Sequence, residues 1–187
     1  MRVIAGSAKG RRLGPVPPGV RPLSDRAREG LFASLAGRVA DARCLDLFAG
    51  TGAVGIEALS RGATSCIFVE QDRAAAAAVR ANLATTRLAD RASVRDRDVS
   101  AYLDHGVEGD RPFDLVFLDP PYALDPQAID AFVVGLSAPG ILSPGWTVVL
   151  TRGHKGPLPA VPLDWAVARQ LRYGDSLLTL YREVGWS

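Results

Sequence analysis

From residue 43 onward, the sequence alternates short apolar runs with segments of helical length, and this alternation restricts the possible folds more than any other feature. It is typical of a mostly parallel sheet whose strands are connected by helices. Strands are expected at 43–48, 65–70, 92–96, 113–119, 146–151, 165–172 and 176–182, and helices at 53–61, 72–88, 98–104 and 127–137. The sequence therefore predicts an α/β protein with a doubly wound sheet of seven strands.

The two ends of the chain depart from this alternation. The last two apolar runs meet at Tyr173-Gly174-Asp175, which leaves no room for a crossover helix, so they are expected to form an antiparallel hairpin. At the N-terminus, short apolar runs flank a glycine-bounded turn and predict a small β-hairpin, which a proline-rich connector follows. Two parts are therefore expected, an extension of residues 1–22 and a domain of residues 23–187. Ser24 should cap a helix that ends at Leu35.

The chain has 187 residues, of which 48% are hydrophobic and 22% charged, as in a single soluble globular domain. No apolar stretch approaches the roughly 18 residues of a membrane span, and no signal peptide is recognisable, so a cytoplasmic protein is expected. Cys44 and Cys66 lie far apart in the sequence, as do His105 and His154. This spacing favours buried, reduced thiols over a disulfide framework, a metal site or a Cys/His catalytic pair.

The net charge of +2 conceals an uneven distribution. Residues 1–28 contain seven basic residues and one acidic residue, a net charge of +6, whereas the remainder contains 15 basic and 19 acidic residues, a net charge of −4. A basic N-terminal region suits contact with nucleic-acid phosphates, but a solvated tail has the same composition. The charge distribution leaves both interpretations open.

A glycine-rich loop follows the first expected strand. Gly50, Gly52 and Gly55 have the spacing GxGxxG, and Glu70 ends the next strand 20 residues after Gly50. Both features match a dinucleotide-binding fingerprint, in which glycines let the backbone approach the ligand and the acid binds ribose hydroxyl groups. The loop therefore predicts a nucleotide-like cofactor, and an NAD-dependent oxidoreductase stays open at this point.

Asp46, inside the first strand, favours a different cofactor. No Lys or Arg occurs between Cys44 and Ser60, so a pyrophosphate would meet only negative charge at the loop. S-Adenosylmethionine has a cationic sulfonium and an ammonium group but no phosphate, and therefore suits a carboxylate. Asp98, after the third strand, either contacts an adenine ring or only caps a helix.

The fourth expected strand ends in Asp119-Pro120-Pro121-Tyr122, at the edge where open α/β sheets bind ligands. The Asp119 carboxylate and the Pro120 carbonyl group are two acceptors beside the aromatic ring of Tyr122. An exocyclic amino group of a nucleobase is a poor nucleophile, and two acceptors on its N–H groups favour a pyramidal, reactive nitrogen. Stacking of the base on Tyr122 would contribute about 1–3 kcal/mol. The motif indicates methylation of a base amino group, with Asp119 or water receiving the proton.

Together these motifs resemble class I S-adenosylmethionine-dependent methyltransferases, and among them the RsmD family of bacterial 16S ribosomal RNA guanine-N2 methyltransferases. The finer resemblance lies in residues 21–32, 45–63 and 173–182, and residues 2–6 resemble the first strand of that family. It therefore spans nearly the whole chain. One departure is Gly30, where a larger residue is usual, and it should cost its helix up to about 1 kcal/mol relative to alanine.

The resemblance implies a Rossmann-like class I methyltransferase fold with a defined site. The residues that would hold the target guanine are Asp119, Pro120, Pro121 and Tyr122. The residues that would bind the cofactor, S-adenosylmethionine, are Asp46, Phe48, Gly50, Gly52, Glu70 and Asp98. The residues that would bind RNA phosphates are Lys9, Arg11, Arg12 and Arg21. The implied partner is 16S ribosomal RNA or the small ribosomal subunit, methylated at a guanine of the position-966 type by a metal-free monomer.

Two other functions stay open. The Asp-Pro-Pro-Tyr motif also occurs in DNA adenine-N6 methyltransferases, although their target-recognition domain usually needs a longer chain than this one. A non-catalytic RNA-binding module would keep the fold and the basic N-terminal region. Identification of the methylated nucleoside and a turnover assay distinguish these alternatives.

Overall fold

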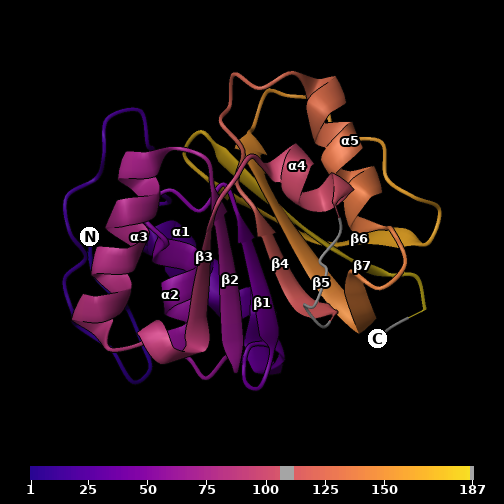
Figure 1. Cartoon of the computed structure of the whole chain (residues 1–187). Coiled ribbons are helices and arrows are strands. Elements are labelled where there is room, and N and C mark those ends of the chain that lie inside the picture. The colour runs from indigo at the N-terminus through magenta and orange to yellow at the C-terminus, as the bar shows by residue number, and fades with distance from the viewer. Residues whose placement is uncertain (106–111, 186–187) are drawn as a thin grey trace.

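The computed structural model describes residues 1–105 and 112–185, and it shows a seven-stranded sheet with helices on both faces (Figure 1). The strands are β1 (Arg43–Leu47), β2 (Ser65–Glu70), β3 (Ala92–Asp96), β4 (Phe113–Leu118), β5 (Leu142–Gly153), β6 (Trp165–Tyr173) and β7 (Ser176–Glu183). The α-helices are α1 (Asp25–Leu35), α2 (Ala53–Ser60), α3 (Arg73–Thr86), α4 (Val99–Asp104) and α5 (Pro126–Leu136). The strand order is β3-β2-β1-β4-β5-β7-β6, with β7 antiparallel to both of its neighbours. The predicted doubly wound sheet and its antiparallel C-terminal hairpin are confirmed.

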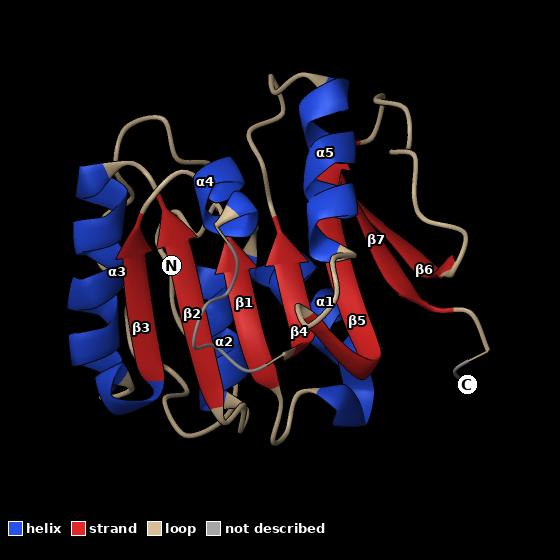
Figure 2. Cartoon of the chain, turned by 45° about the vertical axis from the view of Figure 1, so that its right-hand side comes forward, coloured by secondary structure: helices blue, strands red, loops and turns tan. Residues whose placement is uncertain are grey.

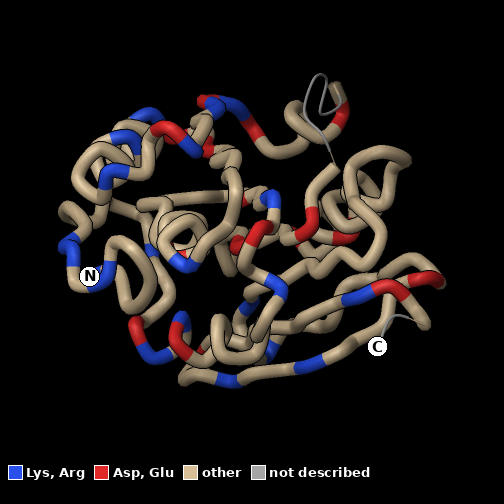
Figure 3. The backbone as a smooth tube through the Cα atoms, turned by 90° about the horizontal axis from the view of Figure 1, so that it is seen from below, with Lys and Arg blue, Asp and Glu red and all other residues tan. Residues whose placement is uncertain are grey.

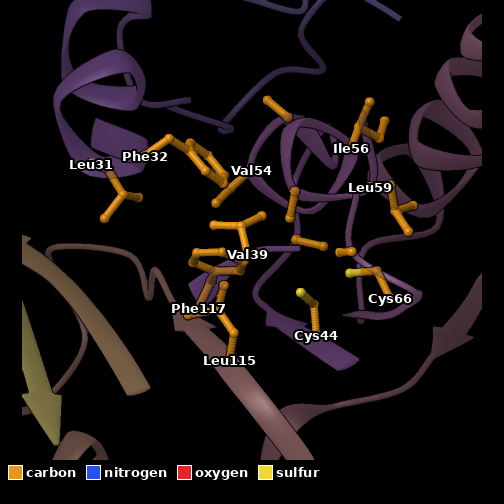
Figure 4. Packing of buried hydrophobic residues seen from close by; sticks show 14 of the residues in the cluster. Leu31, Phe32, Val39, Cys44, Val54, Ile56, Leu59, Cys66, Leu115 and Phe117 are labelled. Atoms are coloured by element: carbon orange, nitrogen blue, oxygen red, sulfur yellow. The ribbon is translucent and has the colours of Figure 1, made fainter. Parts of the chain in front are cut away.

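Two layers of apolar side chains hold the helices to the sheet. On one face α1, α2 and α3 contribute residues such as Leu31, Ile56 and Val79, and Figure 4 shows part of this layer. On the other face α4 and α5 contribute Leu103 and Phe132. Figure 2 shows these two helices in front of the sheet and α1 and α2 behind it.

The alternation of side chains along β1 determines which face each residue reaches. Leu45 and Leu47 belong to the layer beneath α4 and α5, whereas Cys44 belongs to the layer beneath α2. Cys44 and Cys66 are free and buried, as the sequence predicts, and the structure pairs them across β1 and β2. Asp46 shares the face of Cys44, because successive strand residues point to opposite sides, and this directs its side chain toward α2.

Capping side chains define where several helices begin. The carboxylates of Asp72 and Asp98 accept hydrogen bonds from the amide groups three residues later, so α3 and α4 begin one residue after the predicted positions. Ser24 caps α1 through the amide of Ala27 at 3.1 Å, which confirms the prediction for that helix.

The N-terminal segment forms a short version of the predicted hairpin. Arg2 and Arg12 form an antiparallel bridge, and three backbone hydrogen bonds of 2.9–3.1 Å flank it. The amides of Ile4 and Ala5, which a longer ladder would use, donate instead to the two carboxylate oxygens of Glu57 at 2.8 and 3.0 Å. Glu57 is fully buried in α2, so these bonds fasten the N-terminal segment to the sheet domain.

The same segment also contributes to the core. Val3, Ala8 and Leu13 are buried in the layer that contains α1, α2 and α3. The boundary after residue 22 stays a prediction, because the extension packs against the domain that follows it.

Five strands differ in length from the prediction, and four of them differ by one residue at the end. β5 begins at Leu142, four residues earlier than expected. Pro144 and Gly145 suggest a loop in the sequence, whereas in the structure they lie within an irregular stretch of the strand. β1 ends at Leu47, since Phe48 has a positive φ angle of 60° that does not continue a strand.

Gly30 permits a close approach between α1 and the C-terminal hairpin. A Cβ atom at this position would lie 1.7 Å from the hydroxyl oxygen of Tyr173 in β6. A larger residue would therefore require the Tyr173 side chain to move, and glycine lets α1 approach β6 at a cost to the helix of about 1 kcal/mol.

Candidate active site

The carboxyl ends of β2, β1 and β4 lie side by side at one edge of the sheet (Figure 1). Leu47 of β1 is paired with Val69 of β2 and with Leu118 of β4. The glycine loop, Glu70 and Asp119 occupy the ends of these three strands and are therefore neighbours. The fold brings the two sequence motifs together at a topological switch point, where open α/β sheets bind ligands.

The glycine loop makes a sharp turn between β1 and α2. Phe48, Gly50 and Gly52 have positive φ angles of 60°, 56° and 73°. Glycine adopts this conformation readily, whereas Phe48 does so at a cost in strain. Gly55 has a different role, because a Cβ atom there would lie 2.4 Å from the ring of Phe68 in β2. Gly50 and Gly52 therefore allow the turn, and Gly55 allows α2 to pack on the sheet.

Asp46 is buried beneath this loop. Its carboxylate accepts a hydrogen bond from the Gly55 amide at 3.0 Å. Burial raises the pKa of Asp46 well above its usual range, the bond from Gly55 lowers it, and the charges of Asp119 and Glu70 raise it further. The paired ends of β1, β2 and β4 place these three carboxyl groups in one region.

Glu70 holds the loop through both of its carboxylate oxygens. One accepts the amide of Gly50 and the other accepts the amide of Asp72, each at 2.9 Å. A carboxylate oxygen can accept two hydrogen bonds, so ribose hydroxyl groups and the loop can share this side chain. Glu70 therefore positions the glycine loop. This role does not follow from the position of Glu70 at the end of a strand.

The three carboxyl groups suit a cationic ligand. Across residues 1–105 and 112–185, no Lys or Arg forms an ion pair with Asp46, Glu70 or Asp119. A pyrophosphate would be repelled here, whereas a sulfonium and an ammonium group would be attracted. The residues present fit S-adenosylmethionine better than NAD.

The Asp119-Pro120-Pro121-Tyr122 motif begins directly after β4. The Asp119 amide donates to the Leu47 carbonyl oxygen at 3.4 Å, which holds the start of the motif against β1. The residue is partly buried, and burial raises the pKa of the Asp119 carboxyl group to about 7. Near neutral pH this group is divided between its protonated and ionised forms, as suits a residue that exchanges a proton with a substrate.

Tyr122 presents an exposed ring with a defined orientation. Its side chain is 42% exposed, and its hydroxyl group lies 2.6 Å from the hydroxyl of Ser176 at the start of β7. The guanidinium carbon of Arg21 is 5.5 Å from the ring centre. The ring also lies against Gly153, where a Cβ atom would be 3.5 Å away. A fixed and accessible aromatic ring is what stacking with a base requires.

A cavity of about 200 Å³ lies beside the motif. Pro120, Pro121 and Tyr122 line it, and Arg152 and Lys155 add two cationic side chains from the end of β5 and the loop after it. Neither cation stands in a recognisable motif, so the sequence gives no signal for their presence at the site.

Two predicted cofactor residues lie in different surroundings. Asp98 is exposed and caps α4 through the Ala101 amide at 3.1 Å, and its contact with an adenine ring stays a prediction. The ring of Phe48 packs edge-on against Phe132 of α5 with ring centres 5.4 Å apart, so it belongs partly to the core.

The four cations predicted to bind RNA are dispersed. Figure 3 shows basic residues around the N-terminus. Arg11 donates to a backbone carbonyl near the end of α3 at 2.7 Å, Lys9 lines a separate cavity beside two acidic residues, and Arg12 is exposed. Arg21 lies instead over the ring of Tyr122. Of the four, Arg21 is the one that the fold places at the Asp-Pro-Pro-Tyr motif.

Two kinds of feature are absent from the described part of the chain. None of its helices is both long enough and apolar enough to span a membrane. Nowhere in the same residues do three or more His, Cys, Asp or Glu side chains form a group suited to a metal ion.

Comparisons with known proteins agree with one another. The family model described as Conserved hypothetical protein 95 matches residues 1–182. The chain is 36% identical over 184 residues to ribosomal RNA small subunit methyltransferase D of Escherichia coli K12, covering 97% of this chain and 89% of that protein. It is 34% identical over 187 residues to the protein of the same name from Haemophilus influenzae, covering 97% and 93%.

Solved structures show the same likeness. The structure of yhhF from Escherichia coli has a TM-score of 0.86 and 35% identity, and the match covers 98% of this chain and 97% of that chain. TrmN from Thermus thermophilus, with a TM-score of 0.70 and 21% identity over 87% of this chain and 49% of that chain, shows likeness of fold alone.

Proposed function

Because the chain belongs to the RsmD family of small-subunit ribosomal RNA methyltransferases, we propose that it methylates the N2 amino group of a guanine in 16S ribosomal RNA. The methyl donor is S-adenosylmethionine, and the guanine is of the position-966 type. The observation that carries this proposal is the position of Asp119-Pro120-Pro121-Tyr122 beside the carboxyl groups of Asp46 and Glu70 at one edge of the sheet.

The glycine-loop half of the site would hold the cofactor. When bound, S-adenosylmethionine supplies an electrophilic methyl group on a cationic sulfur atom. Asp46 and the loop from Phe48 to Gly52 would border its methionine part, Glu70 its ribose and Asp98 its adenine. Negative charge in a partly buried place attracts a cation more strongly than the same charge in bulk water does.

Asp119 and Pro120 would orient the target amino group. The carboxylate and the carbonyl oxygen would each accept one N–H group, which favours a pyramidal nitrogen and directs its lone pair toward the methyl donor. One N–H proton leaves in the reaction, and Asp119 or water receives it. A carboxyl group whose pKa is about 7 can receive this proton and release it again near neutral pH.

Tyr122 would stack on the guanine ring. Its bond to Ser176 and its contact with Gly153 hold the ring in place, so little conformational freedom is lost when the base arrives. A base that is paired within a helix does not reach such a ring. The target guanine is therefore unpaired or flipped out of its helix when it binds.

Small ribosomal subunits that lack this methylation provide the test. After incubation with the protein and isotopically labelled S-adenosylmethionine, nuclease digestion and mass spectrometry should reveal N2-methylguanine at one mapped nucleotide. N6-Methyladenine in its place would contradict the guanine assignment. Tight binding of NAD without methylation of RNA would contradict the whole proposal.

Because the proposed substrate is ribosomal, the proposed activity is expected in the cytoplasm. The candidate site is complete within one chain, so a monomer is expected to be active. Light scattering during size-exclusion chromatography, with activity measured across the peak, tests this expectation.

A further inference from the structure

We infer that the turn between β6 and β7, together with the start of α1, forms a binding site for one phosphodiester group of the RNA strand that carries the target base. The identity of the RNA rests on the proposed function, whereas the site itself rests on separate geometry. A cavity of about 500 Å³ lies between the proline-rich connector, the first turn of α1 and the β6–β7 turn. It is a different cavity from the one beside Asp-Pro-Pro-Tyr.

Cationic groups from three parts of the chain line this cavity. Arg21 comes from the connector, Arg26 from the first turn of α1 and Arg172 from the end of β6. Asp175 is the one acidic residue in the lining, so the formal charge of the lining is +2. A concave site of this charge suits an anion with several oxygen acceptors, and arginine can bind two phosphate oxygens at once.

The three guanidinium groups are available to a ligand. Arg21 pairs with Asp175 at 3.7 Å, and the two side chains are 71% and 70% exposed, so water weakens this pair. Arg172 donates to the Gly174 carbonyl oxygen at 3.5 Å, the upper limit for a hydrogen bond. Arg26 makes neither an ion pair nor a side-chain hydrogen bond with any residue that the structure describes.

Two lining residues connect the cavity to the proposed base-binding ring. The hydroxyl of Ser176 lies 2.6 Å from that of Tyr122, and the guanidinium carbon of Arg21 lies 5.5 Å from the centre of the ring. A base on Tyr122 and a phosphate in the cavity would therefore belong to the same short stretch of RNA. Tyr122 would select an unstacked base, and the arginines would fix the backbone beside it.

Asp175 provides a test of the inference, because its substitution should change RNA binding in the opposite direction to substitution of an arginine. A phosphate in the cavity competes with the Asp175 carboxylate for Arg21. Removal of this negative charge should therefore strengthen RNA binding, whereas removal of an arginine should weaken it. If the turn had only a structural role, both kinds of substitution would change RNA binding in the same direction.

Binding to immobilised small ribosomal subunits that lack the methylation, measured without methyl donor, is the experiment. The double variant Arg26→Ala/Arg172→Ala should bind about tenfold more weakly. Its slope of log affinity against log salt concentration should be shallower by about 0.7, the contribution of one phosphate in a single strand. Asp175→Asn should bind about twofold to threefold more tightly, as the loss of a weak competing pair allows.

Arg169→Ala is the matched control, because Arg169 is an exposed arginine of the same strand outside the cavity, and its affinity should equal that of the wild type. Calorimetry with S-adenosylhomocysteine checks that each variant keeps its folded cofactor site. If the wild type binds and methylates the subunits and the double variant binds them equally tightly, the inference about the cavity is overturned and the proposed function stands. A wild type that neither binds nor methylates would overturn the proposed function as well.

Inorganic phosphate at matched ionic strength separates the two sources of a phosphate group. If the RNA backbone occupies the cavity, free phosphate should displace the wild type from the subunits more readily than it displaces the double variant. Binding of inorganic phosphate that the double variant loses, together with unchanged binding of that variant to the subunits, would identify a site for free phosphate and would overturn the assignment to RNA.

Discussion

The cofactor half and the substrate half of the candidate site are built in different ways. The cofactor half lies between residues 46 and 70, is largely buried, and is joined by hydrogen bonds from backbone amides to Asp46 and Glu70. The substrate half is exposed and combines Arg21, Tyr122 and Ser176, which are far apart in the sequence. A small ligand of fixed shape suits a rigid, locally encoded site, whereas an RNA surface is contacted by side chains from several elements.

This difference predicts where substitutions should act. Changes in the buried half should alter cofactor affinity and stability, because its polar groups hold one another in place. Changes in the exposed half should alter RNA affinity and leave the fold intact, since surface side chains usually contribute little to stability. Asp119 lies between the halves, and its substitution should affect chemistry itself.

Replacement of Asp119 should have the largest effect on turnover. Asp119→Ala removes one acceptor for the amino group and one acceptor for its proton, so kcat should fall by about 10²–10⁴-fold. Cofactor affinity in calorimetry should change much less, because Asp119 does not hold the glycine loop. Asp119→Asn keeps an oxygen acceptor and should retain more activity than Asp119→Ala. Wild-type turnover by Asp119→Ala would remove this residue from the mechanism.

Glu70→Ala should have the next largest effect. It leaves the amides of Gly50 and Asp72 without their partner, each at a cost of about 1–3 kcal/mol, and it should weaken cofactor binding at least tenfold. Urea unfolding and calorimetry with S-adenosylhomocysteine measure the two losses. Asp125→Ala is the control, because it removes the exposed cap of α5 at a cost of about 1 kcal/mol. A loss of cofactor affinity in this control as large as that in Glu70→Ala would contradict the role given to Glu70.

Tyr122 tests the exposed half in the same way. Tyr122→Ala removes the stacking surface, worth about 1–3 kcal/mol, and should raise KM for small subunits about tenfold without a change in the melting temperature. Tyr122→Phe keeps the ring and loses only the bond to Ser176, so its effect should be smaller. An equal rise in KM in both variants would show that substrate binding depends on the hydroxyl group of Tyr122 and not on its ring.

The sequence predicts the cofactor half well because its determinants are local. A glycine loop after a buried strand has a fixed relation to that strand, so the neighbourhood of Asp46, Gly50 and Glu70 follows from the alternation of strands and helices. The seven strands follow from the same alternation. The substrate half has no such pattern, because the path of the connector that brings Arg21 to Tyr122 depends on tertiary packing. Val20 shows this dependence, since a Cβ atom on Gly50 would lie 2.9 Å from its side chain.

The N-terminal hairpin shows what a local pattern leaves out. The local pattern of apolar residues and glycines predicts the antiparallel pairing of Arg2 with Arg12, but not that Ile4 and Ala5 donate to Glu57 of α2. A buried carboxylate needs hydrogen-bond donors, and the nearby backbone amides supply them. Such a long-range partner is not visible in a local pattern, and it anchors the hairpin to the sheet domain.

The pKa of Asp119 links stability and activity in opposite directions. Burial raises this pKa from 3.8 to about 7, so the folded protein binds more protons than the unfolded chain between these values, and stability falls as pH rises through them. Activity should rise over the upper part of the same range, because the ionised carboxylate is the better acceptor. At pH 8, Asp119→Asn should therefore melt at least about 2 °C higher than the wild type.

Differential scanning calorimetry at pH 5 and pH 8 checks this expectation. Asp90→Asn, which changes an exposed aspartate, is the control and should show no such gain at pH 8. A melting temperature of Asp119→Asn that equals that of the wild type at both pH values would contradict the raised pKa of the Asp119 carboxyl group.

The N-terminal cations should give the smallest effects. Lys9→Ala and Arg12→Ala change side chains that lie apart from Arg21 and from the Asp-Pro-Pro-Tyr motif, so kcat and cofactor affinity should stay unchanged. If each cation contacts one phosphate of a single strand, each substitution should weaken RNA binding a few-fold and reduce the salt slope by about 0.7. Arg21→Ala should differ by also raising KM, because this side chain touches the Tyr122 ring. Wild-type RNA binding that did not depend on salt would exclude phosphate contacts by the N-terminal segment, and the basic charge there would then serve only solvation.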